Sequence, residues 1–580
     1  MPTPNLPPTF DRRAAHAFAQ ELATLYPDRS PGSPGALGAT QWFSDQLERY
    51  GYPTLADRFT AEIPGIGRTR LVNLTVEVPG RAKNQVIVVM AHRDDAGRGP
   101  GANDNASGTA ALIELARAYA KSRSQTAPAV QPTHTIVFLS SDGGVYGGLG
   151  ALRFIRTSPY RGHVVAVINL DAIGGHGRPR IEIAGDQPRS PAGRLVETAA
   201  ARIFDQTGSG PARTSALGQL IDLGFPFSLY EQAPFVGRGV PAITLTTSGN
   251  RPRQSFSDTE RQLDLARIGQ IGRAAQSLLD SLDQGLELAQ GSSSYIYLGT
   301  RRARGWAIEL ALISMLVPFL AAVVDLFARC RRRGIALRPA LRAYRARFFF
   351  WLLLGAFFEL FALVGVWPQG AARPLDPSSS AASKWPILGL LGLAVLGGLA
   401  WFAARGPLVQ RRPPTPEEDL AGHTGALLAL GLLGLLTVAT NPFALIFLLP
   451  SFHAWLWLPH VRGGAFGARL LVLAVGFTGP LLLLGSLAAR FGLGLDAPWY
   501  LAELVAVGYV GLMPFAFALA WTAAAAQLAV LTFGRYAPYP SRSERPRGPL
   551  RELVRGTVLT ALRIRAQRRI AQREKRALEA

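Results

Sequence analysis

Cysteine and histidine are both scarce in this sequence of 580 residues. Cys330 is the only cysteine, so no intrachain disulfide can form. None of the eight histidines lies between His176 and His423, so that interval offers no imidazole ligand. Residues 1–13 are polar and Pro-rich and contain no apolar segment. No signal peptide is visible there, and we expect this stretch to be disordered.

Charge is distributed unevenly along the chain. Residues 1–300 contain 29 Lys and Arg against 26 Asp and Glu, whereas residues 301–580 contain 32 against 13. The second part also carries the long apolar runs. Positive charge beside apolar segments is typical of cytoplasmic membrane loops rather than of a nucleic-acid groove. We therefore expect a membrane protein with no nucleic-acid partner.

Residues 86–108 combine a strand pattern with potential metal ligands. The apolar run from Val86 to Met90 is typical of a buried strand, and His92 follows its end. A Gly- and Pro-rich loop comes next, and Asp104 then precedes an apolar-periodic helix. Open α/β sheets place their sites at the carboxyl ends of strands, and imidazole with carboxylate ligands suits zinc. This stretch therefore predicts a zinc site.

The same stretch resembles metallopeptidase family twenty-eight, the two-zinc exopeptidases that include bacterial leucyl aminopeptidases and glutamate carboxypeptidases. The resemblance rests on the run His92-Arg93-Asp94, on the run PGANDNASG from Pro100 to Gly108, and on the run NLDAIG that contains Asp171. It implies an α/β fold, with a mixed, mostly parallel sheet flanked by helices, over a domain that we place at residues 14–288. By this resemblance, His92, Asp104 and Asp171 would bind one zinc ion, with Asp104 at the family's bridging position.

Other positions depart from the family pattern. The family's two adjacent glutamates fall on Gly144 and Val145, and the histidine of a later motif falls on Gln254. The resemblance assigns the first glutamate as the general base, and the second glutamate and the histidine as zinc ligands. The second metal position would thus be lost, whereas one zinc with three protein ligands and a water is a legitimate catalytic arrangement. Asp94 and Asp142 are weak candidates for a replacement base.

These departures leave three hypotheses open. The leading hypothesis is a membrane-anchored, zinc-exopeptidase-like protein with a degenerate active site that binds a peptide or protein without cleaving it. The first alternative is an active metallo-aminopeptidase or amide hydrolase that uses a single zinc. The second is a transporter with a regulatory ectodomain, for which Glu359, central in an apolar segment, is the best candidate pathway residue.

The second part of the chain predicts an all-α transmembrane bundle. After a linker at 289–305, we expect about seven helices within residues 306–534. The apolar segments are 306–328, 347–367, 385–404, 424–440, 442–459, 468–489 and one long segment within 498–533.

Loop charge predicts the orientation of this bundle. Loop 329–347 carries eight Arg and no acidic residue, and the tail 535–580 carries 13 basic and four acidic residues. The positive-inside rule therefore places the tail in the cytoplasm and the peptidase-like domain outside, most simply in the plasma membrane of a bacterium. Export of this domain would require an upstream signal or anchor. Residues 550–578 read as a basic amphipathic helix that would lie on anionic membrane lipid.

Overall fold

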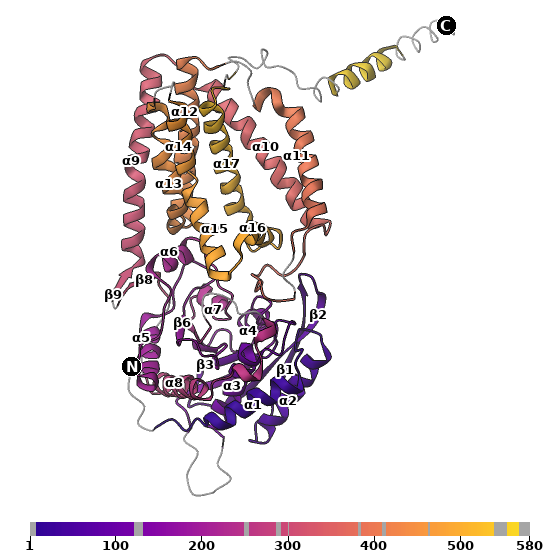
Figure 1. The fold of residues 1–580 in the computed structure, drawn as a ribbon, viewed down its shortest axis with the longest axis vertical. Coiled ribbons are helices and arrows are strands. Elements are labelled where there is room, and N and C mark those ends of the chain that lie inside the picture. The colour runs from indigo at the N-terminus through magenta and orange to yellow at the C-terminus, as the bar shows by residue number, and fades with distance from the viewer. Residues whose placement is uncertain are drawn as a thin grey trace, which may run out of the picture.

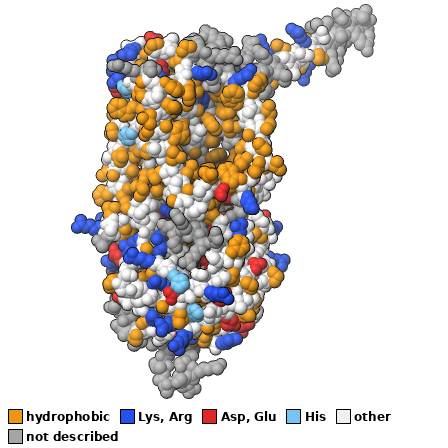
Figure 2. Space-filling view, in the orientation of Figure 1, with side chains coloured by type: hydrophobic (Ala, Val, Ile, Leu, Met, Phe, Trp, Pro, Cys, Tyr) orange, Lys and Arg blue, Asp and Glu red, His pale blue; other side chains and the backbone are white. Residues whose placement is uncertain are grey.

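The structure is a computed structural model. It describes residues 7–120, 131–248, 255–285, 292–299, 301–380, 384–408, 413–461, 465–536, 538 and 554–567. An α/β domain, residues 7–304, lies at one end of a long bundle of helices, residues 305–536, which we call the helical region (Figure 1). On the face shown in Figure 2, hydrophobic side chains cover the middle of the helical region, whereas charged side chains gather over the α/β domain and at the far end of the helical region.

A seven-stranded sheet forms the centre of the α/β domain. The strands are β1 (Leu55–Ile63), β2 (Gly67–Val78), β3 (Ala82–His92), β4 (His134–Ser141), β5 (Val164–Leu170), β6 (Arg180–Glu182) and β7 (Ala242–Thr246). Their order is β1-β2-β4-β3-β5-β7-β6. The central four strands are parallel, and the antiparallel pairings lie toward the two edges. The predicted mixed, mostly parallel sheet is confirmed.

Helices cover both faces of this sheet. They are α1 (Arg12–Leu25), α2 (Pro34–Glu48), α3 (Gly108–Arg117), α4 (Leu149–Thr157), α5 (Gly193–Thr207), α6 (Ala216–Gly224), α7 (Ala233–Gly237) and α8 (Leu265–Gln284). Alternate residues of β3 explain the two layers, because Ile87 and Val89 pack with α1, α3 and α8, whereas Val88 and Met90 pack with α4 and α7. The carboxyl ends of β3 and β5 therefore sit at one edge of a buried, rigid sheet.

Two predicted boundaries of the α/β domain differ in the structure. Phe10 lies in the stretch predicted to be disordered, yet its side chain is buried and its N–H donates to Gln276 Oε1 at 2.9 Å. The predicted linker 289–305 contains a hairpin, β8 (Tyr295–Leu298) and β9 (Arg301–Arg304). The hairpin packs because Tyr295 is buried and its hydroxyl donates to the Pro191 carbonyl oxygen at 2.8 Å. A packed hairpin, rather than a flexible tether, therefore leads into the first long helix.

The helical region follows as nine α-helices among the described residues. They are α9 (Gly305–Arg332), α10 (Arg338–Leu363), α11 (Ile387–Leu408), α12 (Pro416–Thr440), α13 (Leu445–Trp455), α14 (Phe466–Val475), α15 (Thr478–Phe491), α16 (Ala497–Ala506) and α17 (Leu512–Thr532). By length and composition, six described helices or helix runs could cross a membrane, or seven if α14 and α15, which are bent by 48°, form one broken span.

One predicted segment is divided in the structure. The apolar stretch within 498–533 forms two helices, α16 and α17, rather than one. The break includes Gly508, whose φ of +77° lies in the left-handed region that favours glycine. Of the two helices, α17 is the one long enough to cross a membrane. Glu359 lies on α10 and is half-buried.

The basic tail lies far from the α/β domain. Residues 554–567 of the tail are helical and exposed, whereas the rest of the predicted helix 550–578 lies outside the described residues. This helix projects from the end of the helical region opposite the α/β domain (Figure 1).

Candidate metal centre

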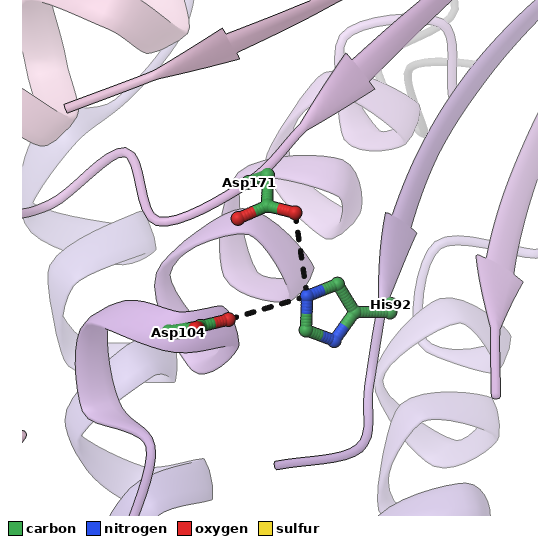
Figure 3. A group of neighbouring side chains, drawn as sticks. All are labelled: His92, Asp104 and Asp171. Carbon is green, nitrogen blue, oxygen red and sulfur yellow. Dashed lines mark ion pairs between the residues drawn. The ribbon is translucent and has the colours of Figure 1, made fainter. Parts of the chain in front are cut away.

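Three potential metal ligands converge at the carboxyl edge of the sheet. His92 ends β3, Asp171 directly follows β5, and Asp104 lies in the short helix η1 (Ala102–Ser107) between β3 and α3. His92 Nε2 lies 3.3 Å from Asp104 Oδ1 and 3.5 Å from Asp171 Oδ2 (Figure 3). The three ligand atoms lie within 4.8 Å of one another, and they are the one such group found among the described residues.

The imidazole of His92 is oriented for this role. The ring is buried, and its Nδ1 lies 3.1 Å from the backbone carbonyl oxygen of Asp94, which leaves Nε2 to face the two carboxylates. Fixing one ring nitrogen on a carbonyl oxygen is how proteins orient a metal-binding histidine. Burial opposes the charged form of His92, but the carboxylates of Asp94, Asp104 and Asp171 outweigh it and hold its pKa well above the usual value.

Side chains of the PGANDNASG run hold the two acidic loops together. Asn105 Oδ1 accepts the N–H of Ala172 at 3.0 Å, and its Nδ2 donates to the Leu170 carbonyl oxygen at 2.9 Å. Asn103 Oδ1 accepts the N–H of Gly174 at 2.8 Å, and Ser107 Oγ accepts that of Ile173 at 3.0 Å. These bonds fasten the Asp171 loop to η1, so the run positions both carboxylates against Nε2.

Asp258 is a further positioning residue that the sequence analysis did not single out. Its two carboxylate oxygens accept the N–H groups of Asn103 and Asp104, each at 2.8 Å. Burial raises the pKa of Asp258 to about 6, despite these hydrogen bonds. Its place in the run RQSFSDT, beside Gln254, is the signal that could have identified it.

Of the two positions with missing glutamates, Gly144 lies directly against the side chain of His92. A Cβ atom on Gly144 would lie 2.2 Å from the Cβ atom of His92, so no side chain fits there unless His92 moves. Val145 is buried in an apolar cluster with Tyr146 and Leu149. The third position with a missing ligand, Gln254, lies outside the described residues.

Both candidate bases are already engaged. The carboxylate of Asp94 accepts the N–H groups of Gly144 at 2.8 Å and Val145 at 3.1 Å. That of Asp142 accepts the Val72 N–H at 2.9 Å and lies 3.8 Å from the Arg93 guanidinium. Burial raises the pKa of Asp142 to about 6 against the attraction of Arg93. Neither residue is among the described residues that line the cavity above the metal ligands, so neither is placed to activate water there.

Glu231 and Gln232, just before α7, are engaged in hydrogen bonds within the α/β domain. Glu231 is buried and accepts a hydrogen bond from Ser141 Oγ at 2.8 Å. Burial raises its pKa to about 7. Gln232 Oε1 accepts from Thr244 Oγ1 at 2.6 Å, and its Nε2 donates to the Ala184 carbonyl oxygen at 2.9 Å.

A cavity of about 120 Å³ lies over the three ligands, between the α/β domain and the helical region. His92, Asp104 and Asp171 line it from the α/β domain. Asp376 and Ser378, from the loop between α10 and α11, and Arg490 and Phe491, at the end of α15, line it from the helical region. The centre thus opens into a space that both parts of the chain enclose.

The donor set fits a zinc ion. One imidazole nitrogen and two carboxylates are typical zinc ligands, and their spacing allows one ion to reach all three. Three protein ligands leave a position open toward the cavity, as in catalytic rather than closed structural zinc sites.

Comparison with known proteins assigns this part of the chain to a family. Residues 73–279 match the profile of Peptidase family M28, so the α/β domain contains a domain of this family, as the resemblance implied. Leupeptin-inactivating enzyme 1 of Streptomyces exfoliatus is 26% identical over 174 residues, which are 29% of this chain and 37% of that protein. BOS complex subunit NCLN of Mus musculus is 29% identical over 199 residues, which are 31% of this chain and 34% of that protein.

The chain thus matches little more than a third of the length of these relatives. Among solved structures, the glutaminyl cyclase of an Acidobacteriales bacterium is 22% identical, with a TM-score of 0.39. The match covers 49% of this chain and 98% of that one.

Proposed function

We propose that this protein is a membrane-anchored, zinc-exopeptidase-like protein that binds one zinc ion and uses the site to bind a peptide or protein ligand. His92, Asp104 and Asp171 would hold the ion, which would supply a Lewis-acid contact for a carbonyl or carboxylate oxygen of the ligand. In this proposal the α/β domain, residues 14–288, is a binding domain that has lost the two-metal peptidase reaction of its family.

The observation that carries this proposal is the packing at Gly144. The position that the resemblance assigns to the general base is filled by the His92 side chain, 2.2 Å from where a Cβ atom would lie. Asp94 and Asp142 are bonded elsewhere. Loss of a positioned general base typically lowers a hydrolytic rate by about 10²- to 10⁴-fold.

The proposal extends to the membrane. The apolar helices and the Arg-rich loops support a region, residues 306–534, that spans a bacterial plasma membrane and leaves the α/β domain outside. The tail, residues 535–580, would be cytoplasmic, and its exposed helix would contact anionic lipid. The similarity to a subunit of a BOS complex supports a protein partner for the α/β domain.

A second candidate function is an amide hydrolase or aminopeptidase that uses a single zinc. The open position toward the cavity favours it. Hydrolysis of aminoacyl-nitroanilides by the full-length protein in detergent separates the two. We expect no hydrolysis above that of Asp104→Asn. Hydrolysis that a chelator abolishes and that is lost in Asp104→Asn would overturn the binding function in favour of the enzyme.

A further inference from the structure

The loop between α10 and α11 lies on the loop that has lost the family's glutamates. We call residues 368–380 the covering loop; the connection that contains it descends from the helical region to the α/β domain (Figure 1). Its Asp376 N–H donates to the Val145 carbonyl oxygen at 3.4 Å, and its Ser380 N–H donates to that of Ala96 at 2.7 Å. The hydroxyls of Ser380 and Tyr146 lie 3.0 Å apart. The covering loop thus follows the backbone around position 145.

Packing and charge hold the covering loop in place. Leu375 is buried in the same apolar cluster as Val145. Arg373 Nε donates to the Gly147 carbonyl oxygen at 2.6 Å, and its guanidinium pairs with Asp186. Gly147 is required for this approach, because a Cβ atom there would lie 2.5 Å from the Cβ atom of Arg373. The contact is therefore close and specific.

The covering loop is also tied to the helical region. The Leu375 carbonyl oxygen accepts a hydrogen bond from the Tyr500 hydroxyl of α16 at 2.7 Å. Nearby, Asn441 Nδ2 donates to the Leu223 carbonyl oxygen at 2.9 Å, and Arg490 pairs with Asp222. The helical region therefore presents the covering loop to the α/β domain from a fixed position.

Asp376 places a carboxylate in the cavity above the metal ligands. Its Oδ1 accepts the N–H of Ser378 at 2.7 Å and the hydroxyl of the same residue at 2.6 Å, which fixes its orientation. It lines the same cavity as His92, Asp104 and Asp171. Burial raises its pKa to about 6, and the negative charges of Asp104 and Asp171 act in the same direction. A carboxylate so placed is stabilised by a cation between it and those two residues.

We propose that Asp376 belongs to the surroundings of the metal centre: the helical region holds its carboxylate at the cavity that His92, Asp104 and Asp171 also line. This inference rests on the proposed binding of zinc by His92, Asp104 and Asp171. The centre is then composite: the α/β domain provides one imidazole and two carboxylate ligands, and the helical region provides a further negative charge at the same cavity. Zinc affinity then depends on both parts of the chain, because the position of the covering loop on the α/β domain determines where the Asp376 carboxylate lies.

The test is the zinc affinity of the full-length protein in detergent, measured by competition with a chromophoric chelator. Asp376→Asn removes the charge with little change in shape, and we expect affinity to fall on the order of tenfold, as for other residues that act on a metal through its surroundings. Asp376→Glu keeps the charge and should remain within a few-fold of the wild type. Asp496→Asn, a charge change outside the cavity lining, should leave affinity unchanged.

The outcomes distinguish this inference from the proposed function. If His92→Ala abolishes binding but Asp376→Asn binds zinc as the wild type does, Asp376 is not part of the centre and the composite site is wrong. Equal losses in Asp376→Asn and Asp376→Glu would also overturn it, because packing rather than charge would then be responsible. If the wild type binds no zinc, both proposals fall.

A cross-link shows whether the covering loop stays docked in these variants. Cysteines at Tyr146 and Ser380, in a Cys330→Ala background, should react with a short bifunctional maleimide, because the Tyr146 ring spans the gap between the two positions and the reagent can span the same gap. We expect Asp376→Asn to give the same cross-linking yield as the protein with Asp376 intact, although its zinc affinity is weaker. A lost cross-link in Asp376→Asn would assign the weaker affinity to undocking, and would count against a direct role of the charge.

Discussion

The side chain of His92 contacts two parts of the α/β domain that differ in what they present to it: η1 with the Asp171 loop, and the loop that contains Gly144. On the side of Nε2, η1 and the Asp171 loop are fastened to each other by Asn103, Asn105 and Ser107, so that two carboxylates face the ring. In the second loop, Gly144 brings bare backbone against Cβ, Cγ and Cδ2 of the same side chain. One loop therefore presents carboxylates to the imidazole, whereas the other presents backbone and the apolar side chain of Val145, against which the covering loop packs. Under the proposed function, the first keeps one metal position and the second has no side chain that could bind another ion.

Restoring the family residue at Gly144 should break this arrangement rather than revive a peptidase. Gly144→Glu places a Cβ atom 2.2 Å from that of His92 and buries a charge, so we expect a loss of at least about 3 kcal/mol in the free energy of unfolding. Zinc should be lost as well, because His92 must move. Thermal unfolding and elemental analysis measure both effects. Gly162→Glu, in an open turn, is the control. A stable, peptidase-active Gly144→Glu protein would refute the packing argument.

Glu231 is one of the buried carboxylates around the loop without metal ligands, and its titration can be tested. Its pKa of about 7 in the folded state exceeds the ordinary value of 4.5, so its contribution to stability is present below pH 4.5 and is lost as the pH rises through 7. Glu231→Gln stays neutral and keeps an acceptor for Ser141. In chelator, this variant should match the wild type near pH 4 and exceed it by about 3 kcal/mol at most near pH 8. A difference in unfolding temperature that does not depend on pH would contradict this assignment.

Asn105 tests the fastening on the side with ligands. Asn105→Ala leaves the Ala172 N–H and the Leu170 carbonyl oxygen without their partner in a buried place. We expect a loss of about 2 kcal/mol and a clear fall in zinc affinity, because Asp104 and Asp171 would no longer be held together. Asn84→Ala, at an exposed position of β3, should change neither quantity. Unchanged zinc affinity in Asn105→Ala would show that the hydrogen bonds of Asn105 do not position Asp104 and Asp171.

Gly147 tests the contact between the covering loop and the α/β domain, and we expect the smallest change in stability here. Gly147→Ala meets Arg373 and forces alanine to a φ of +91°, so we expect about 1 kcal/mol of destabilisation and faster proteolysis of the covering loop. Gly51→Ala has a similar φ of +82° but meets no atom within 4 Å, so it controls for backbone strain alone. Equal protease sensitivity in the two variants would mean that the covering loop is not fastened at Gly147.

Much of the α/β domain could be predicted because local patterns determine it. The apolar runs before His92 and Asp171 give neighbouring strands, and the PGANDNASG run identifies the segment after β3 that hydrogen-bonds to the Asp171 loop. The predicted ligands His92, Asp104 and Asp171 are brought together in the structure, although their binding of zinc stays a prediction.

The cover over the site could not be predicted. Asp376 and Val145 are far apart in the sequence, and no periodicity links a short polar loop to a particular partner. The one available signal was that Asp376 is the only acidic residue in the loop 368–384. The division of residues 498–533 into two helices was also missed, because an apolar run reads as continuous unless the conformation of Gly508 is known.

The metal content of the purified full-length protein, measured by elemental mass spectrometry after dialysis against trace zinc, tests the central claim most directly. We predict one zinc per chain in the wild type and none in His92→Ala, with His163→Ala, at an exposed histidine, as the control. Two zinc ions per chain would contradict the account, because the second metal position would then exist without Val145 and Gln254. The absence of zinc from the wild type would contradict it equally.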